Sequence, residues 1–333
     1  MRTSVTERLG IEHPIVQAPI GGLSVPALAG AVSKAGGLGT MSITWRELDD
    51  IRTAIETLRT ITDRPFGVNL VIDEPMDDRV EVALAAGASI VSFFWGDPSP
   101  YIERVHAAGA IATLTVGSAD EARRAVDLGI DVVVAQGWEA GGHVWGQVST
   151  LALVPVVVDA VPNTPVIAAG GIADGRGLAA VLALGAGAAW MGTRFVASEE
   201  APAHPDYVAR LLAASETDTF YGELFDVGWP EAPHRVLRNA TVDAWLAAGS
   251  PPTGERPGEG EVLATRPDGS ELVRYGSSAV AAGAIGRIGE LSLWSGQGVG
   301  LVRERLPAAE IVRRTVAEAE AVLAGLAGIA AAR

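Results

Sequence analysis

The first 195 residues alternate between two kinds of segment, and this alternation limits the fold more than any other feature of the chain. Short apolar runs rich in Val and Ile are followed by Ala-rich amphipathic stretches, with Gly or Pro between them. Such apolar runs are typical of parallel strands that are buried on both faces. The amphipathic stretches are typical of helices that cover a sheet. The pattern therefore predicts repeated strand–helix units.

Eight units fit into this part of the chain. The predicted strands span 14–19, 38–43, 66–72, 88–96, 110–116, 130–137, 164–172 and 187–195. The predicted helices span 25–36, 45–61, 77–87, 99–108, 119–129, 149–161 and 174–186, and Ser118 is expected to cap the helix that begins at 119. Eight units favour a (β/α)8 TIM barrel, which typically takes about 250 residues. A doubly wound open sheet is the alternative, but the count of eight and the lack of GxGxxG after the first strand disfavour it.

The remaining third of the chain has a different composition. Residues 196–248 look helical, 250–271 are rich in Pro, Gly and Glu and indicate an exposed loop or hairpin, and 307–333 read as a long amphipathic helix. We therefore expect an α/β protein with three parts: a barrel over 1–199, a smaller, mainly helical capping domain over 200–300, and a C-terminal helix over 301–333 that packs on the barrel. The cap should cover the carboxyl ends of the strands, where barrels of this kind place their active sites.

Composition excludes several classes of protein. The 333 residues carry a formal net charge of −15, which disfavours nucleic acid and anionic membranes as partners. The absence of cysteine excludes disulfides, thiolate catalysis and Cys-ligated metals. No apolar run of about 20 residues is present, and the first residues lack the apolar core of a signal peptide. We expect a cytoplasmic enzyme; a homodimer is compatible with the sequence, which does not determine the oligomeric state.

Two glycine pairs follow the last two predicted strands. Gly170 and Gly171 end the seventh strand, and Gly192 with Thr193 ends the eighth. Backbone N–H groups at these positions of a barrel commonly bind phosphate. Each pair alone is equally consistent with an ordinary tight turn, but the two together favour a phosphate site. A sugar phosphate and FMN would both fit.

The segment AQGWEAGGHVWG, 135–146, follows the sixth strand and holds the best catalytic candidate. His143 comes after two glycines, in what we expect to be a flexible, exposed loop, where a neutral imidazole can exchange a proton near neutral pH. The other four histidines lie in ordinary settings and are expected to be surface or packing residues. A zinc site is not expected, because no second ligand stands at suitable spacing. Gln136 is placed to hydrogen-bond the edge of a heterocycle, and Glu139 to support the loop.

Further ligand candidates lie at other strand ends. Asn69 ends the third strand, where it contacts a ligand or merely caps the turn, and the backbone of Ala18 and Pro19 can lie against a planar ring. In the cap, aromatic residues either line the pocket or form its core; they are Tyr221, Phe225, Trp229 and Trp294. The arginine pair of APHRVLRNA, Arg235 and Arg238, is interpreted as a solvated helix face rather than a dinucleotide site.

These motifs together resemble one known family. QAPIGGLSVPALAGAVSKAGGLGTM, FGVNL, QGWEAGGH, VIAAGGIADG and MGTRF occur in the order seen in nitronate monooxygenases, formerly 2-nitropropane dioxygenases, and cover about residues 10–200. LWSGQGVGL at 293–301 resembles a further family segment. The first turn reads APIGG where members often have APM, and the cap has no motif that identifies a subclass. The resemblance implies an FMN-dependent TIM barrel with His143 as the catalytic residue.

The resemblance also implies where the flavin binds. Its phosphate would lie on the two glycine pairs, and its ring near the ends of the first, third and sixth strands. The complete set of expected cofactor-binding residues is Ala18, Pro19, Asn69, Gln136, Gly141, Gly142, Ala169, Gly170, Gly171, Trp190, Met191, Gly192 and Thr193. FMN is expected rather than FAD because no adenosine-binding fingerprint is present.

Four functions remain open at this stage. The first is oxidation of alkyl nitronates or nitroalkanes by O2, giving a carbonyl compound and nitrite. The second uses the same flavin site for an NAD(P)H:quinone reductase or an FMN-dependent enoyl-ACP reductase, since both share this fold and the EAGGH histidine. The third is a flavin-free barrel isomerase or lyase, and the fourth is a flavin-binding protein without turnover. The yellow colour of a flavoprotein separates the third from the others.

Overall fold

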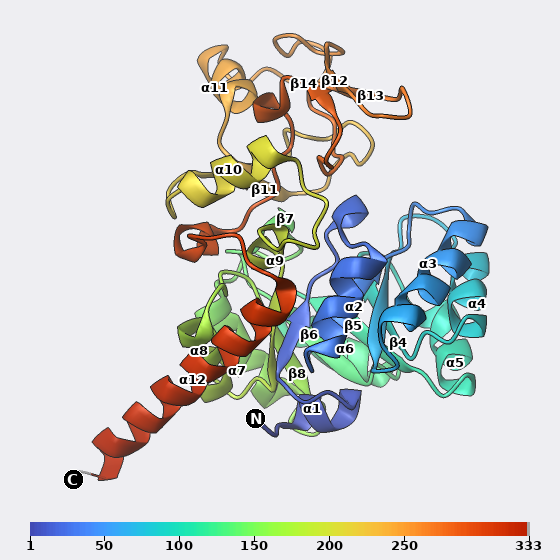
Figure 1. Cartoon of the computed structure of the whole chain (residues 1–333), viewed down its shortest axis with the longest axis vertical. Helices are drawn as coiled ribbons and strands as arrows, with labels where there is room; N and C mark the ends of the chain where they lie inside the picture. The colour runs from blue at the N-terminus through green and yellow to red at the C-terminus, as the bar shows by residue number, and fades with distance from the viewer. Residues whose placement is uncertain (332–333) are drawn as a thin grey trace.

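The computed structural model describes residues 1–331 and contains a closed barrel of eight parallel strands below a smaller cap (Figure 1). The sheet order is β1-β9-β8-β6-β5-β4-β3-β2. A parallel bridge between Val16 and Leu38 joins β1 to β2 and closes the sheet. The TIM-barrel prediction is confirmed. The strands are β1 (Ile15–Gln17), β2 (Gly39–Ser42), β3 (Phe66–Val71), β4 (Ile90–Phe94), β5 (Ile111–Val116), β6 (Val132–Gln136), β8 (Val166–Ala169) and β9 (Ala188–Met191).

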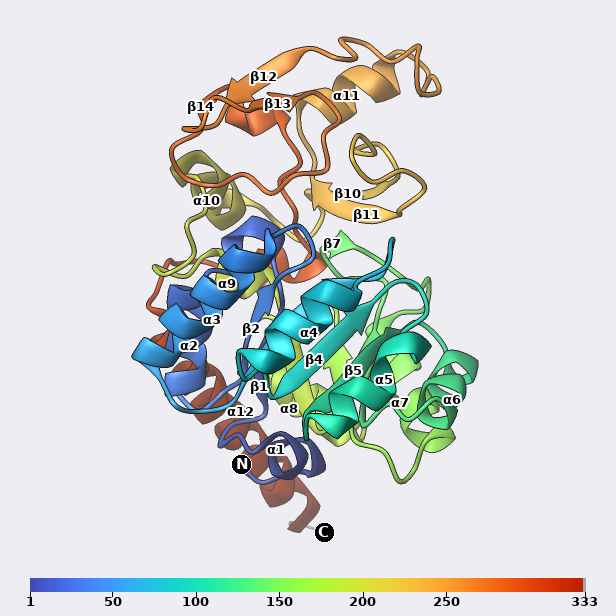
Figure 2. The ribbon, with the colours of Figure 1, turned by 90° about the vertical axis from the view of Figure 1, so that its right-hand side faces the viewer.

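Helices follow the strands and form the outer ring of the barrel, as Figure 2 shows. Each predicted strand and helix is present, shorter than predicted by a few residues at its ends. Ser118 accepts a hydrogen bond from the Glu121 N–H, so the predicted cap is also present. The helices are α2 (Pro26–Lys34), α3 (Leu48–Ile61), α4 (Asp77–Ala85), α5 (Ser99–Ala107), α6 (Ala119–Asp127), α7 (Thr150–Ala160) and α8 (Gly175–Ala183).

The long C-terminal helix α12 (Ala308–Ala331) supplies the eighth helix of the ring. It packs between α8 and α2 after the chain has returned from the cap. The Glu318 carboxylate accepts the Gly175 N–H at the start of α8 at 2.7 Å. A Cβ on Gly175 would lie 2.5 Å from the α12 backbone, so the two helices touch only because this residue is glycine. The predicted helix over 307–333 is therefore present, with 332–333 outside the described residues.

The barrel is filled at one end and open at the other. Its interior holds apolar side chains such as Val16, Val132 and Ile167, and α1 (Ser4–Leu9) adds Val5 and Leu9 to the same cluster. Helix α1 therefore plugs the amino-terminal end. The carboxyl ends of the strands face the cap, so a ligand can enter the structure between barrel and cap.

The cap combines helices with two antiparallel three-stranded sheets, β10-β11-β7 and β13-β12-β14, of which β7 (Gly142–His143) comes from the barrel loop after β6. The prediction that 196–248 is helical is only partly right, because two strands that pair with each other interrupt the helices. The elements are α9 (Thr193–Val196), α10 (Pro205–Ala213), β10 (Thr219–Gly222), β11 (His234–Leu237), α11 (Ala240–Ala247), β12 (Val262–Thr265), β13 (Glu271–Val273) and β14 (Ile285–Gly286); short 3₁₀ turns lie at η1 (Gly21–Leu23), η2 (Ile288–Glu290) and η3 (Gln297–Leu301).

The segment 250–271 contains the predicted hairpin, since β12 pairs with β13. It is not an exposed loop throughout. Arg256 is buried, and its side chain is 3% exposed. The polar composition of this stretch concealed a buried ion pair, because a charged residue is buried when partners distant in sequence satisfy it.

We predict that Gly39→Ala severely destabilises the barrel. A Cβ at this position of β2 would lie 1.9 Å from the carbonyl oxygen of Ala29 in α2, and a backbone clash cannot relax by rotating a side chain. The expected loss is about 3 kcal/mol or more, the upper end for overpacking. Gly325→Ala on α12, which would meet no atom within 4 Å, is the matched control and should stabilise by about 0.5–1 kcal/mol. Thermal unfolding compares them; equal melting temperatures would contradict the packing described.

Candidate active site

A cavity of about 530 Å³ lies between the carboxyl ends of the barrel strands and the cap. Small-molecule and cofactor sites typically measure about 300–1,000 Å³. His143 and every predicted cofactor-binding residue except Met191 line this cavity. The Met191 side chain is fully buried in the layer between strands and helices, because successive residues of a strand face opposite sides of the sheet. Trp190, the neighbouring residue, faces the cavity instead.

The two glycine pairs form an anion cradle at one end of the cavity. Gly170 and Gly171 have φ angles of 105° and 71°, a conformation that favours glycine. In the described part of the chain, the N–H groups of Gly170, Gly171 and Gly192 donate no hydrogen bond. Thr193 begins the short helix α9, so its N–H also lacks an intrahelical acceptor. These free donors stand where barrels bind phosphate, after the last two strands and at a short extra helix.

Two polar side chains that line the cavity, Asn69 and Gln136, are largely satisfied by hydrogen bonds within the protein. Asn69 is buried and donates to the Ser92 carbonyl oxygen at 3.2 Å. The Gln136 amide donates to the His143 carbonyl oxygen at 3.2 Å and accepts the Trp145 N–H at 2.8 Å. Gln136 therefore holds the backbone on both sides of residue 144, a role that its position at a strand end did not reveal.

The EAGGH loop is fixed by contacts along its whole length. The Glu139 carboxylate accepts the N–H and hydroxyl of Thr150 at 2.8 and 3.0 Å, so it supports the loop as predicted. The backbone of Gly296 lies so close that a Cβ on Gly141 would be 2.2 Å from its nitrogen. The Gln297 N–H in turn donates to the Glu139 carbonyl oxygen. The LWSGQGVGL segment is therefore the surface against which the loop packs.

His143 lies in a strand, and the prediction of a flexible, exposed loop is wrong. Gly142 and His143 form β7, which pairs with Arg235 and His234 of β11. The cap thus holds the residue that the barrel loop presents. No hydrogen bond within the described residues reaches the buried Nε2 atom of His143. Burial first, and the nearby His234 second, lower the pKa of His143 to about 3, so the imidazole is neutral at physiological pH.

Aromatic rings surround His143. The rings of Trp229 and Trp294 lie 3.8 and 5.2 Å from the imidazole, measured between centroids, and both residues line the cavity. Trp95 lies 6.2 Å from His143 and 5.2 Å from Trp229, and Trp45 lies 5.8 Å from Trp229. Trp45 and Trp95 were missed from the sequence. Their signal was their position, since both follow a barrel strand directly.

The other cap candidates take structural roles. Phe225 is fully buried in the core of the cap, and Tyr221 packs edge-on against Trp138 rather than lining the cavity. Arg235 is 2% exposed, so the prediction of a solvated helix face is wrong for it. It lies on a strand inside the cap and donates to the Trp138 carbonyl oxygen at 2.8 Å. Arg238 is exposed and pairs with Asp243.

Two absences hold for residues 1–331. No group of three or more His, Asp or Glu side chains is arranged to hold a metal ion. No helix is long and apolar enough to cross a membrane.

Sequence comparison identifies relatives with related activities. The family model for nitronate monooxygenase matches residues 2–78 and 72–318. The nitronate monooxygenase of Pseudomonas aeruginosa is 33% identical, with 96% of this chain and 99% of that protein covered. A Mycobacterium tuberculosis protein, named (3aS,4S,5R,7aS)-5-hydroxy-7a-methyl-1-oxo-octahydro-1H-indene-4-carboxyl-CoA dehydrogenase, is 41% identical over 75% of this chain and 70% of its own length.

Structural comparison gives the same picture. FabK from Thermotoga maritima is 35% identical and superposes with a TM-score of 0.81 over 99% of both chains. The nitroalkane oxidase of Streptomyces ansochromogenes is 32% identical, with a TM-score of 0.79 over 97% of this chain and 99% of that one. Both solved structures therefore share the fold of this chain over nearly its whole length. The chain belongs to the nitronate monooxygenase family and is an oxidoreductase.

Proposed function

We propose that this protein binds one FMN non-covalently and oxidises alkyl nitronates with O2 to a carbonyl compound and nitrite. The single observation that carries the proposal is a neutral, half-buried histidine, its Nε2 atom buried, that faces an aromatic cavity next to a cradle of free N–H groups. The cradle is complementary to one phosphate group, and the apolar walls are complementary to a flat ring. The family is flavin-dependent, and the choice of FMN rather than FAD rests on the lack of an adenosine-binding fingerprint.

The residues that would hold FMN are those predicted to do so, without a side-chain role for Met191. Gly170, Gly171, Gly192 and Thr193 would bind the phosphate, while Ala18, Pro19, Asn69 and Gln136 would border the ring. When bound, FMN supplies electron acceptance from the substrate and electron transfer to O2. The protein orients the substrate, excludes water through the cap and presents His143 as a proton acceptor or hydrogen-bond partner.

The environment of His143 favours nitronates over neutral nitroalkanes. Burial is the main cause of the low pKa of His143, and the nearby His234 is the second cause. A proton taken from a neutral nitroalkane would therefore sit on an imidazolium that no carboxylate stabilises. A nitronate has already lost this proton. The observed site consequently suits a substrate that arrives ionised.

A second candidate function is supported by one observation in the cavity and one relative. Within the described residues, Arg266 is the one formally charged side chain that lines the cavity. A cation at the cap side suits a phosphate-bearing substrate or donor, and one relative is named as a dehydrogenase of a carboxyl-CoA compound. An NAD(P)H-dependent reductase of quinones or enoyl thioesters is therefore the alternative to nitronate oxidation.

The three parts of the chain receive separate roles in this proposal. Residues 1–199 bind the flavin, 200–300 cap the site and select the substrate, and 301–333 complete the helical ring of the barrel. Small molecules and O2 are the partners, nucleic acid is not, and a cytoplasmic location remains part of the proposal.

We predict that heat releases one equivalent of FMN per chain from the purified protein. The cradle has donors for a single phosphate. Chromatography of the released cofactor against FMN and FAD standards makes the measurement. Release of FAD, or recovery of a colourless protein, would exclude the assignment.

We predict that His143→Ala retains flavin but loses about 10²–10⁴-fold in turnover of neutral nitroalkanes, the usual contribution of general acid–base catalysis. Oxidation of ionised nitronates should suffer less, because no proton has to be removed. In wild type, His143 should stay neutral as the pH falls through about 6.5, the ordinary pKa of histidine, since its own pKa is about 3. Steady-state rates of both enzymes across this pH range test the role. Equal rates on the neutral substrate would show that His143 is structural.

We predict that a nitronate reduces the bound flavin rapidly without O2, whereas NADH and NADPH reduce it slowly or not at all. A nitronate carries its own electrons, and the cap offers no dinucleotide fingerprint. Anaerobic stopped-flow absorbance of the oxidised flavin band compares the three donors. Rapid bleaching by NAD(P)H, with no response to a propyl nitronate, would favour the reductase.

A further inference from the structure

The segment 226–232 of the cap, named here the Trp229 loop, places an aromatic ring against His143. Trp229 is buried at its tip, with Gly228 before it at a φ of 98°. The Trp229 ring lies over the imidazole with 3.8 Å between the ring centroids and is tilted against it by 34°. Its other contacts are the edges of Trp45 and Trp95. The side chain therefore covers one face of the proposed catalytic group.

A single imidazole closes the base of this loop. His234 follows the loop directly and is fully buried. Its Nε2 accepts the Phe225 N–H at 3.1 Å, and its Nδ1 lies 2.9 Å from the Ala232 carbonyl oxygen, to which it can donate only as the Nδ1–H tautomer. Both ends of the loop are thus tied to one ring. Burial lowers the pKa of His234 to about 4, so Nε2 remains free to accept at physiological pH.

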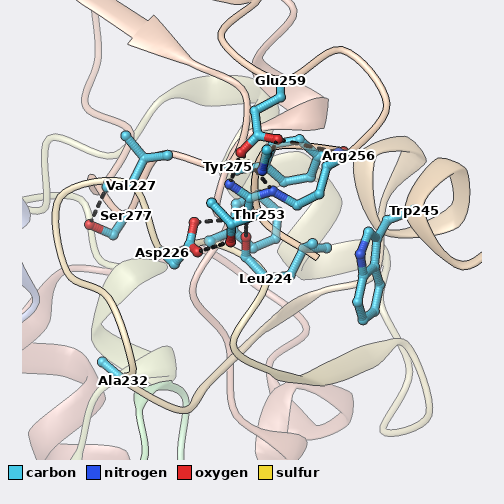
Figure 3. Close-up of polar contacts among 12 residues, drawn as sticks. Leu224, Asp226, Val227, Ala232, Trp245, Thr253, Arg256, Glu259, Tyr275 and Ser277 are labelled. Atoms are coloured by element: carbon cyan, nitrogen blue, oxygen red, sulfur yellow. Dashed lines mark hydrogen bonds and ion pairs between the residues drawn. The ribbon is translucent and has the colours of Figure 1, made fainter. Parts of the chain in front are cut away.

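A buried ion pair fixes the start of the loop from the other side. Figure 3 shows Arg256 between Asp226 and Glu259, with its guanidinium over the Tyr275 ring. Arg256 donates to Asp226 at 2.8 Å and to the Leu224 carbonyl oxygen at 3.1 Å. The Thr253 hydroxyl donates to the second Asp226 oxygen at 3.0 Å. A shift of the Asp226 carboxylate would therefore break its bonds to both the buried Arg256 side chain and Thr253.

The two anchors and the pairing of β11 with β7 connect the loop to the catalytic residue. His234 pairs directly with His143 in the strand register, and their rings lie 5.7 Å apart. Strand β11, which begins with the residue that closes the loop, is therefore paired directly with β7, which carries His143. A substitution of His234 should therefore change the position of the Trp229 ring relative to His143. A residue that only packs in the core would not have this effect.

We infer that His234 is a positioning residue that holds Trp229 against His143, and that Trp229 determines specificity by admitting substrates that are planar and unbranched at the reacting carbon. Because the centroid of the Trp229 ring lies 3.8 Å from that of the imidazole, this face of His143 has no room for a branched substrate carbon. Primary nitronates fit this restriction better than secondary ones. The substrate part of this inference rests on the proposed nitronate oxidation, whereas the positioning part does not.

The test is a double-mutant cycle on the complete flavin-loaded protein, with Trp229→Ala, His234→Phe and the double variant. Trp229→Ala should lower the ratio of kcat/KM for propyl-1-nitronate over propyl-2-nitronate by about 10-fold, the scale of one methyl group in a pocket. His234→Phe should lower the same ratio, but it should have no further effect once Trp229 is absent. Independent effects in the double variant, or an unchanged ratio in either single variant, would overturn the inference.

A second readout does not depend on turnover. NMR spectra of histidine-labelled protein should show the His143 ring protons shifted by the Trp229 ring current, and both single variants should reduce that shift. His204→Phe is the matched control, because His204 caps α10 and also bonds backbone at both nitrogens; it should change neither shift nor ratio. If His234→Phe does not fold, Asp226→Asn tests the other anchor. A normal ring-current effect without nitronate activity would refute the proposed function alone; an unshifted His143 in wild type would refute the positioning.

Discussion

The site depends on the hydrogen-bonded pairing of β7 with β11, because this pairing joins the barrel to the cap at His143. A barrel loop alone would leave the histidine free to move and solvated. Pairing with His234 and Arg235 removes part of its surface from water, and this desolvation is the main cause of its low pKa. The aromatic rings from barrel and cap can surround the imidazole only because this strand pair fixes its position. The chemistry proposed for the site follows from that one constraint.

Close backbone contacts make the pairing possible. Gly141 and Gly296 approach each other so nearly that neither position has room for a Cβ, and Gln136 binds the chain on both sides of residue 144. The glycines of EAGGH and SGQG thus serve packing as well as ligand access. Gly175 also serves packing, because α12 can lie against α8 only where this residue has no Cβ. A larger residue at any of these positions would push two packed segments apart, in addition to changing the local turn.

The sequence predicted the barrel well because its signals are local. Apolar runs, Ser118 and the glycine pairs after β8 and β9 each depend on neighbours within a few positions. His143 was found by the same kind of pattern, although its setting was not. The predicted flavin positions gather around one cavity, because parallel strands bring their carboxyl ends to a single edge.

The remainder could not be predicted because it depends on contacts between distant residues. The sequence suggested a solvated Arg235, but in the structure its side chain donates to the Trp138 carbonyl oxygen. It also suggested that Arg256 lies in an exposed loop, but Arg256 is paired with Asp226. His234 looked ordinary because both of its hydrogen bonds go to backbone groups, which carry no sequence signature. For Trp45 and Trp95, the only feature in the sequence that indicated a place near the site was their position after a barrel strand.

The central claim is that the barrel mouth holds FMN with its reactive ring next to His143. A crystal structure of the protein with its flavin tests this most directly. If FMN binds as proposed, its phosphate will lie within hydrogen-bond distance of the N–H groups of Gly170, Gly171 and Gly192. Its ring system will lie beside Gln136 and His143. A phosphate bound elsewhere, or a flavin ring separated from His143 by the Trp229 loop, would contradict it.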